Sequence, residues 1–296
     1  MQTALPLAQK AAALFAERGF ENARLEAELL LAAVLGMKRL ELYTQFDRPV
    51  QTAELERFRA YVRRRLRHEP LQYIVGDTQF RSLRLRVDPR ALIPRPETEV
   101  LVGVVLAHLR NRDAAAVSVL DLGTGTGAIA LSLLAEGDIA RAVATDVSPD
   151  ALELAAENAA LLGLVDRLEL RCGDLWEAVP PAERYHVIVS NPPYVDAAGA
   201  AALAPEVREH EPAMALFAPD GGRAVLDRIV AEAHAHLVQG GMLALELAPE
   251  QAAAIAERMT ATGHFEAVTV TPDLAGRARI VSGLVRQAIS REDRDE

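Results

Sequence analysis

Cysteine is nearly absent from this sequence, since Cys172 is the only one in 296 residues. A single cysteine excludes an internal disulfide and any metal site built from several cysteines, and we expect Cys172 to be a small buried apolar residue. The seven histidines also lack the spacing of metal ligands. His234 and His236 are two residues apart, which on a helix directs them to different faces. The sequence therefore predicts no metal site.

Long hydrophobic runs are missing as well. No stretch approaches the ~20 uninterrupted apolar residues that cross a membrane. Residues 1–20 carry charges where a signal peptide has its apolar core. Half of all residues are nevertheless apolar, so the chain can bury a sizeable core. We expect a globular monomer that acts in the cytoplasm without contact to a membrane.

Positive charge is scarce in the larger part of the chain. Residues 94–296 hold 16 Lys and Arg against 31 Asp and Glu, whereas residues 1–93 hold 16 against 11. A domain that neutralises several phosphates normally presents a basic face, so we expect no stable nucleic-acid partner. The run RRRLR at 63–67 is the exception. It is either the solvated face of a helix, which we favour, or a binding patch.

The first part of the chain, residues 1–70, has the pattern of a small helical bundle. Gly19 and Gly36 end two helical stretches, Asn22 is the expected N-cap of the second, and TAELERFRAYVRRRLRH forms a third. A connector follows at 71–93, where LQYIVGDTQF and SLRLRVD alternate apolar and polar residues. This period of two predicts a β-hairpin.

Strand and helix patterns alternate over residues 94–290, which is typical of a parallel sheet wrapped by helices. Five strands are predicted at VSVLDLG, RAVATD, LELRCGD, YHVIVS and GMLALEL (241–247). FEAVTVT and ARIVSGLVR then indicate a closing antiparallel pair. The sequence thus predicts an α/β fold with a doubly wound, mostly parallel sheet and an antiparallel C-terminal strand. The polar tail at 291–296 is predicted to be disordered.

The loop DLGTGTG, residues 121–127, joins the first of these strands to its helix. Glycines there let the backbone approach a ligand and expose N–H groups at a helix N-terminus. Their spacing is GxGxG, not the GxGxxG of pyrophosphate-binding folds. Asp146, at the tip of the next strand, can accept hydrogen bonds from two ribose hydroxyls, so the pair favours a nucleoside cofactor. A tight turn with a helix-capping Asp is the alternative.

The stretch VIVSNPPYV, residues 187–195, ends a buried strand in two prolines. Strands one and four are neighbours in a doubly wound sheet, so this loop faces the glycine loop. Asn191 Oδ1 and the Pro192 carbonyl can accept the two hydrogens of a planar NH2 group, and Tyr194 can pack on its plane. Such a site would aim a poorly nucleophilic nitrogen at a methyl donor. A rigid Pro-Pro turn is the alternative.

The glycine loop, the acidic residue and Asn-Pro-Pro-Tyr together resemble the S-adenosylmethionine-dependent amino methyltransferases. Nearly the whole chain resembles one family among them, the protein-(glutamine-N5) methyltransferases of class I peptide chain release factors, of the HemK/PrmC type. The segments that carry this resemblance are EPLQYIVGDTQF, LIPRPETEVLV, LDLGTGTGAIAL, TDVSPDALELAAEN, IVSNPPYV, VREHEPAMAL and DLAGRARIVSG.

This resemblance implies a class I methyltransferase fold, a reaction and its residues. S-adenosyl-L-methionine would methylate the glutamine of a Gly-Gly-Gln motif, leaving S-adenosyl-L-homocysteine, and the N-terminal bundle would recognise the release factor. The cofactor would be bound by Gly123, Thr124, Gly125, Thr126, Gly127, Asp146, Asp174, Leu175, Asn191, Arg95, Pro96, Glu97 and Thr98. The glutamine would be bound by Asn191, Pro192, Pro193, Tyr194 and Glu211. Of these, Asn191, Pro192 and Tyr194 would be catalytic.

Some details and alternatives stay open. Either Leu175 or Trp176 would form the wall against the adenine. Separately, Pro94 and Pro96 predict that the stretch up to Thr98 is rigid and non-helical. A DNA or RNA amino-group methyltransferase, acting on adenine N6, cytosine N4 or guanine N2, is the main alternative, although the acidic catalytic part argues against it. A module that binds a cofactor without catalysis is a further alternative. A dehydrogenase is disfavoured by the loop spacing.

Overall fold

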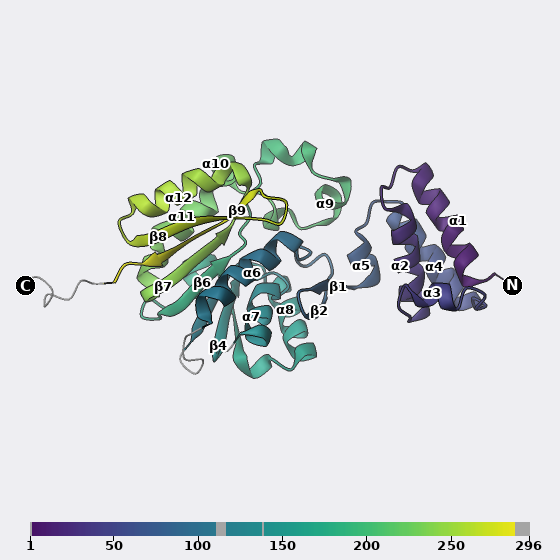
Figure 1. Cartoon of the computed structure of the whole chain (residues 1–296), viewed down its shortest axis with the longest axis horizontal. Coiled ribbons are helices and arrows are strands. Elements are labelled where there is room, and N and C mark those ends of the chain that lie inside the picture. The colour runs from purple at the N-terminus through teal and green to yellow at the C-terminus, as the bar shows by residue number, and fades with distance from the viewer. Residues whose placement is uncertain (1, 111–116, 138, 288–296) are drawn as a thin grey trace, which may run out of the picture. The chain divides into compact units, whose positions relative to one another are not determined.

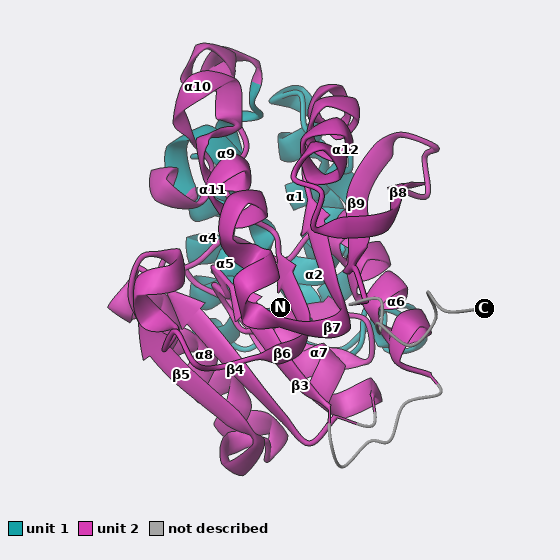
Figure 2. Cartoon of the chain, turned by 90° about the vertical axis from the view of Figure 1, so that its left-hand side faces the viewer, with its two compact units in different colours: residues 1–77, 203–210 teal, residues 78–202, 211–296 magenta. Residues whose placement is uncertain are grey.

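The computed structural model describes residues 2–110, 117–137 and 139–287 (Figure 1). They form two compact units, of which unit 1 comprises residues 1–77 and 203–210 and unit 2 comprises residues 78–202 and 211–296 (Figure 2). The chain therefore leaves unit 2 once, adds a short segment to unit 1 and returns. The tail predicted to be disordered, 291–296, lies outside the described residues.

Unit 1 is a helical bundle. Its apolar residues meet in one buried cluster that includes Phe15, Leu31 and Phe58, because spacing of three and four residues puts them on one face of each helix. Gly36 ends the second helix in the predicted left-handed conformation, with φ of 65°. The helices are α1 (Ala4–Glu17), α2 (Ala23–Leu35), α3 (Glu41–Thr44), α4 (Thr52–Arg65), α5 (Leu71–Val75) and α9 (Pro205–His210).

The basic run at 63–67 is only partly the solvated face that we favoured. Arg63 is exposed, but Arg65 is buried. The Arg65 guanidinium donates to Glu26 at 2.6 Å and to Glu206, on α9, at 3.0 Å. A buried guanidinium requires such partners, because leaving its charge unpaired away from water is costly. Arg65 therefore holds α9 in the bundle.

The connector is a hairpin over part of its length only. Two strands, β1 (Asp77–Phe80) and β2 (Leu83–Arg86), pair in a small sheet. The strand predicted upstream of them is wrong, because α5 occupies Leu71–Val75. Tyr73 and Ile74 are adjacent residues of α5 and both are buried, whereas adjacent residues of a strand point to opposite faces.

Unit 2 contains, among its described residues, a seven-stranded sheet in the order β5-β4-β3-β6-β7-β9-β8. The five strands from β3 to β7 are parallel, whereas β9 runs antiparallel to both β7 and β8. The predicted fold class is thereby confirmed. The strands are β3 (Ser118–Leu122), β4 (Arg141–Asp146), β5 (Leu168–Cys172), β6 (Tyr185–Ser190), β7 (Leu237–Glu246), β8 (Phe265–Pro272) and β9 (Ala278–Val285).

Helices cover both faces of this sheet. Val119 and Leu120 are adjacent in β3 yet belong to two different apolar clusters, as the alternation of a strand requires. The Val119 cluster includes residues of α6 (Pro96–Leu109), α7 (Ala128–Glu136) and α8 (Pro149–Leu162). The Leu120 cluster includes residues of α11 (Ala224–Glu232) and α12 (Ala252–Ala261), which follow the short α10 (Pro219–Gly222). The sheet is therefore doubly wound.

Two further expectations concern single elements. β7 begins at Leu237, ahead of the predicted start at 241. Cys172 is exposed rather than buried, because it ends β5, which is an edge strand of the sheet. None of the described helices is both long and apolar enough to cross a membrane.

Candidate active site

The candidate site is a cavity of about 530 Å³ in unit 2, at the carboxyl ends of β3, β4 and β6. Its volume and its place in the sheet are those of a small-molecule site in a doubly wound fold. Many predicted residues line it together: Arg95, Thr98, Gly123, Thr124, Gly125, Thr126, Asp146, Asp174, Leu175, Asn191, Pro192 and Pro193. Five described residues of the prediction are not part of its lining: Pro96, Glu97, Gly127, Tyr194 and Glu211.

The glycine loop is tied to the tip of the neighbouring strand. The Gly125 N–H donates to Asp146 Oδ2 at 2.9 Å, and the Ser148 N–H donates to Asp146 Oδ1 at the same distance. Gly125 has φ of 56°, a conformation that residues with a Cβ rarely adopt. Burial raises the pKa of Asp146, while its backbone hydrogen bonds oppose that rise. Asp146 thus shapes the loop and retains lone pairs for a further donor.

A second carboxyl group supports the loop from below. Asp121, near the end of β3, is fully buried and accepts from Thr124 Oγ1 at 2.7 Å and from the Ala130 N–H at 3.3 Å. Burial raises the pKa of Asp121 to about 7. Our sequence analysis missed this residue. An ionisable side chain inside the apolar strand VSVLDLG was the available signal, because such residues are rarely buried without a partner.

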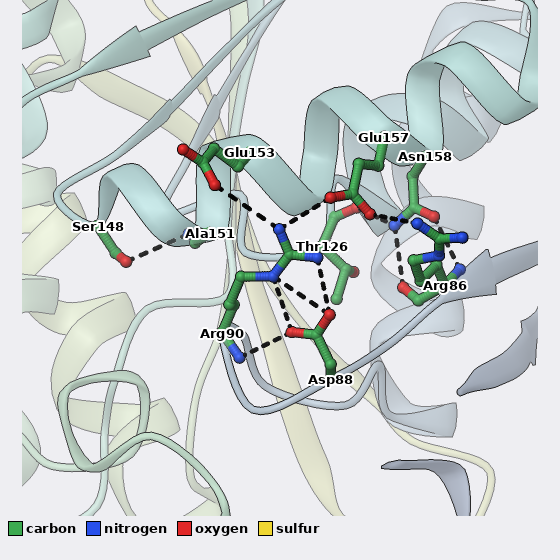
Figure 3. Close-up of polar contacts among 9 residues, drawn as sticks. All are labelled: Arg86, Asp88, Arg90, Thr126, Ser148, Ala151, Glu153, Glu157 and Asn158. Carbon is green, nitrogen blue, oxygen red and sulfur yellow. Dashed lines mark hydrogen bonds and ion pairs between the residues drawn. The ribbon is translucent and has the colours of Figure 1, made fainter. Parts of the chain in front are cut away.

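The hairpin connector also supports the loop, through Asn158 on α8 (Figure 3). The Asn158 Nδ2 group donates to the carbonyls of Thr126 at 2.9 Å and Arg86 at 3.1 Å, and Asn158 Oδ1 accepts from the Arg86 N–H at 2.7 Å. Beyond β2, Arg90 pairs with Asp88 and with a glutamate of α8. The segment that follows the hairpin is thereby fixed as one wall of the cavity.

Leu175 and Trp176, the two candidates for the adenine wall, differ in position. Leu175 lines the cavity and has φ of 51°, an uncommon conformation for a residue with a branched side chain. Trp176 is not part of the lining: its ring stacks on His236 at 4.9 Å and its Nε1–H donates to the Arg228 carbonyl. The apolar wall on this side is therefore Leu175.

Asn191 lies on the opposite side of the cavity, directly after β6. Its Nδ2 group donates to Thr98 Oγ1 at 3.0 Å. Tyr194 is largely buried, and its carbonyl accepts from Gln251 Nε2 at 3.0 Å. Its hydroxyl approaches Glu246 Oε1 at 3.4 Å. The loop is therefore held by contacts to α6, to β7 and to the segment before α12.

The stretch that contains Arg95 to Thr98 is rigid but partly helical. The prediction of a non-helical stretch is wrong beyond Arg95, because Pro96 occupies the first position of α6, where its fixed φ fits a helix and its missing N–H costs nothing. The Arg95 guanidinium donates to Glu211 Oε1 at 2.7 Å, and Glu97 pairs with Arg277 at 3.2 Å. These ion pairs tie the start of α6 to the segment that contains Glu211 and to the residues before β9.

Glu211 is buried beside this stretch. Besides its ion pair with Arg95, it accepts from the Ile93 N–H at 3.4 Å. It begins the part of the chain that returns from unit 1, so the ion pair fixes the returning segment at the cavity wall. Pro212 and Met214, a few residues further on, line the cavity. The predicted contact between Glu211 and a substrate stays a prediction.

The cavity therefore combines two chemically different sides. One side offers backbone N–H groups, a carboxylate and an apolar wall, and the other offers an amide in a loop that has few N–H groups. A nucleoside ligand fits the first side, and a planar NH2 group fits the second. The fold and this arrangement define a class I methyltransferase.

The comparisons with known proteins agree with that class and narrow it. Residues 7–76 match the family model "PrmC N-terminal domain", and residues 99–210 match "Methyltransferase small domain". The release factor glutamine methyltransferase of Cereibacter sphaeroides is 44% identical, with 90% of this chain and 93% of that protein covered. That of Geobacter sulfurreducens is 43% identical, with 91% and 92% covered. The chain belongs to the release factor glutamine methyltransferase family.

Solved structures support the fold at lower identity. A methyltransferase from Pyrococcus furiosus superimposes with a TM-score of 0.52 at 20% sequence identity. The match covers 69% of this chain and 89% of that protein. At this identity the similarity concerns the fold alone.

Proposed function

We propose that this enzyme methylates N5 of the glutamine in the Gly-Gly-Gln motif of class I peptide chain release factors, in the cytoplasm, with S-adenosylmethionine as methyl donor. The observation that carries the proposal is the presence of Asn191 in one cavity with the glycine loop and Asp146. The names of the relatives, release factor glutamine methyltransferases, support a release factor as the substrate. The two glycines of the motif add no side chains beside the glutamine, which suits entry into a cavity of limited volume.

The cofactor side of the cavity fits S-adenosylmethionine. Backbone N–H groups at the start of α7 suit a carboxylate, Asp146 suits ribose hydroxyls, and Leu175 presents an apolar surface to the adenine. When bound, this cofactor supplies an electrophilic methyl group, whose bond to sulfur breaks as the amide nitrogen takes it. The residues around it serve to bind and orient.

The amide side addresses the low reactivity of the glutamine nitrogen. Its lone pair is delocalised into the carbonyl group, as the amide rotation barrier of ~18–20 kcal/mol reflects. Asn191 Oδ1 and the Pro192 carbonyl would accept the two N–H groups and fix the direction of the nitrogen, with Tyr194 as the wall of the amide plane. Catalysis is then chiefly proximity and orientation. Methyl transfer leaves the amide nitrogen positively charged and still carrying both hydrogens; this cation is strongly acidic and releases one proton to water, so the proposal assigns no catalytic base.

Unit 1 is the proposed contact for the body of the release factor, because its residues hold 13 Lys and Arg against 12 Asp and Glu, whereas the remainder of the chain is strongly acidic, with 19 against 30. Deleting the first 70 residues would also remove Arg65, the partner of Glu206, so charge reversal at exposed positions is the cleaner test. We expect Arg63→Glu combined with Arg67→Glu to lower kcat/KM severalfold on the whole factor. Activity on a short Gly-Gly-Gln peptide should stay the same.

A matched control places the same charge change on unit 2. Arg110 and Arg184 are exposed there, so Arg110→Glu combined with Arg184→Glu alters net charge equally. A similar loss on the whole factor in both double variants would show a general charge effect. It would remove the assigned role of unit 1.

The reaction itself is tested by methyl transfer from labelled S-adenosylmethionine. The samples are an unmethylated release factor, the same factor with its Gly-Gly-Gln glutamine changed to alanine, and a nucleic-acid control. We expect label only in the factor with the intact glutamine. Label in the nucleic acid would instead favour the amino-group methyltransferase of DNA or RNA.

A further inference from the structure

A chain of hydrogen bonds runs behind Asn191, away from the proposed substrate. Asn191 Nδ2 donates to Thr98 Oγ1 at 3.0 Å, and Thr98 lies near enough to the Glu246 carboxylate for its hydroxyl to lower the pKa of that group, which places the carboxylate as the acceptor for the Thr98 hydrogen. The Tyr194 hydroxyl approaches the same carboxylate at 3.4 Å. These residues come from three places in the sequence: the first turn of α6, the loop after β6 and the end of β7. Thr98 and Glu246 are both buried, so water does not replace their partners.

Each donor in this chain sets the direction of the next bond. A carboxylate can only accept hydrogen bonds, so the Thr98 hydroxyl donates its single hydrogen to Glu246. Thr98 Oγ1 can then only accept from Asn191, which requires the NH2 end of the Asn191 amide. A reversed amide would bring two oxygens together and lose the bond. Oδ1 is therefore the end of the amide that stays available for the substrate.

We propose that Glu246 and Thr98 are positioning residues that fix the orientation of the Asn191 amide, so that its oxygen rather than its NH2 group meets the target amide. This inference rests on the proposed function, in which Asn191 accepts an N–H of the glutamine. It explains why an ionisable side chain follows the buried apolar run Met242–Leu245 of β7. Neither residue needs to touch the reacting atoms.

The charge state of Glu246 gives the proposal a pH signature. Burial raises its pKa to about 7, against the lowering effects of the Thr98 bond and Arg279 on β9. Glu97 on α6 raises it further, and Tyr194 lowers it slightly through its hydroxyl. A protonated Glu246 can donate, so it no longer dictates that Thr98 accepts from Asn191. The orientation is therefore enforced most strongly above about pH 7.

The first test compares two substitutions at one position. Thr98→Val replaces the hydroxyl by a methyl group of nearly equal size, whereas Thr98→Ser keeps the hydroxyl and removes the methyl group. We expect Thr98→Val to lower kcat about tenfold, the effect of one net hydrogen bond, with little change in the dissociation constant of S-adenosylmethionine. Thr98→Ser should stay within about twofold of the wild type.

The second test changes the end of the chain. Glu246→Leu removes the acceptor and should lower kcat to a similar extent, whereas Glu246→Gln keeps one acceptor oxygen and should retain more activity. The wild-type kcat should fall as pH drops below about 7, and this part of the profile should be missing in Glu246→Gln. The Tm of each variant identifies any that fold poorly.

A third readout does not depend on turnover. The side-chain NH2 signals of Asn191 are assigned in nitrogen-15 spectra by their loss in Asn191→Asp. In the wild type and in Thr98→Ser we expect slow hydrogen exchange of one NH2 hydrogen. In Thr98→Val that protection should be lost.

The outcomes separate this inference from the function beneath it. If Asn191→Ala lowers kcat by ~10²–10³ but Thr98→Val and Thr98→Ser behave alike in rate and in exchange, the orientation role is refuted and the function stands. If the wild type fails to methylate the glutamine, the function is refuted. The exchange data on Asn191 then still decide whether Thr98 holds the amide.

Discussion

The two sides of the cavity are built by different means. On the cofactor side the main hydrogen bonds join residues that are close in sequence: Gly125 and Asp146 are 21 residues apart, and Thr124 and Asp121 are three apart. On the amide side, Asn191 and Thr98 are 93 residues apart. The first side is a local turn completed by its neighbours. The second exists only once distant parts of the chain have packed.

The two sides also differ in what they present. The glycine loop offers backbone groups, which any sequence with the right turn supplies. The amide side depends on the identity and orientation of individual side chains, and on support by Thr98, Glu246 and Gln251. We therefore expect substitutions on the amide side to alter kcat and substitutions on the cofactor side to alter cofactor affinity or stability.

The largest effect is expected for Asn191→Ala. Loss of one positioned hydrogen-bond partner lowers rates by ~10²–10³ in comparable sites, so kcat should fall by about that factor. Calorimetric titration with S-adenosylmethionine should give nearly the wild-type dissociation constant. A large loss of cofactor affinity in this variant would contradict the separation of the two sides.

The next effect concerns the backbone behind Tyr194. A Cβ on Gly222 would lie 2.0 Å from the Tyr194 carbonyl oxygen, so Gly222→Ala must displace the loop. A misplacement of about 1 Å can cost ~100-fold in rate, and we expect a loss of kcat of that order. Gly221→Ala is the matched control.

Gly221 also has a positive φ, but a Cβ there would meet no described atom within 4 Å. Its substitution should cost about 1 kcal/mol of stability and leave kcat nearly unchanged. Kinetics and urea unfolding of the two variants measure both quantities. Equal rates in the two variants would show that the loop tolerates displacement.

The next effect concerns the protonation of Asp121, which is buried beneath the glycine loop. Asp121 has a pKa of about 7 in the folded protein and about 4 in the unfolded chain. Between these two pH values the folded state keeps a proton that the unfolded state has lost. The stabilisation that protonated Asp121 gives the folded state is complete below about pH 4 and is lost as pH rises through about 7. Relative to Asp121→Asn, the wild type should lose roughly 2–3 kcal/mol between pH 5 and pH 8.

Urea unfolding of both proteins across this range measures the difference. Parallel stability curves would show that Asp121 is ionised in the folded protein. They would also show that water reaches the base of the glycine loop.

The smallest effect is expected for Asp146→Ala. Hydrogen bonds to a charged group contribute about 1.5–3 kcal/mol, so the dissociation constant of S-adenosylmethionine should rise roughly 10–100-fold. At saturating cofactor, kcat should change little. The dissociation constant for Asp146→Asn should lie between those of the wild type and Asp146→Ala, because the oxygen of the new amide can still accept from the Gly125 N–H. A fall in kcat without loss of affinity would assign Asp146 to the chemistry instead.

The difference between the two sides also explains what the sequence could predict. The strands of the parallel sheet, the glycine loop and the helix end at Gly36 follow from local periods and turn chemistry, and the structure has all three. Leu71–Val75 was misread, because five residues are too few to separate a period of two from one of 3.6. Pro96 was misread because a proline can begin a helix as well as prevent one.

Residues that act through distant partners could not be found in this way. Asn158 and Gly222 matter because of the carbonyls of Thr126 and Tyr194, which no spacing rule connects to them. Glu246 could have been noticed in the sequence, because GMLALEL places an ionisable residue in a buried strand. Its partner Thr98 became visible only in the folded protein.

The ion pair between Arg65 and Glu206 has a consequence for folding during synthesis on the ribosome. Glu206 follows Arg65 by 141 residues, so at 5–20 residues per second the ribosome supplies it on the order of 10 s later. Until then the nascent bundle has Glu26 but lacks its second carboxylate for this guanidinium. Synthesis must pass through β3, β4 and β6 before α9 emerges. The N-terminal unit, although made first, is completed only after most of the parallel sheet has left the ribosome.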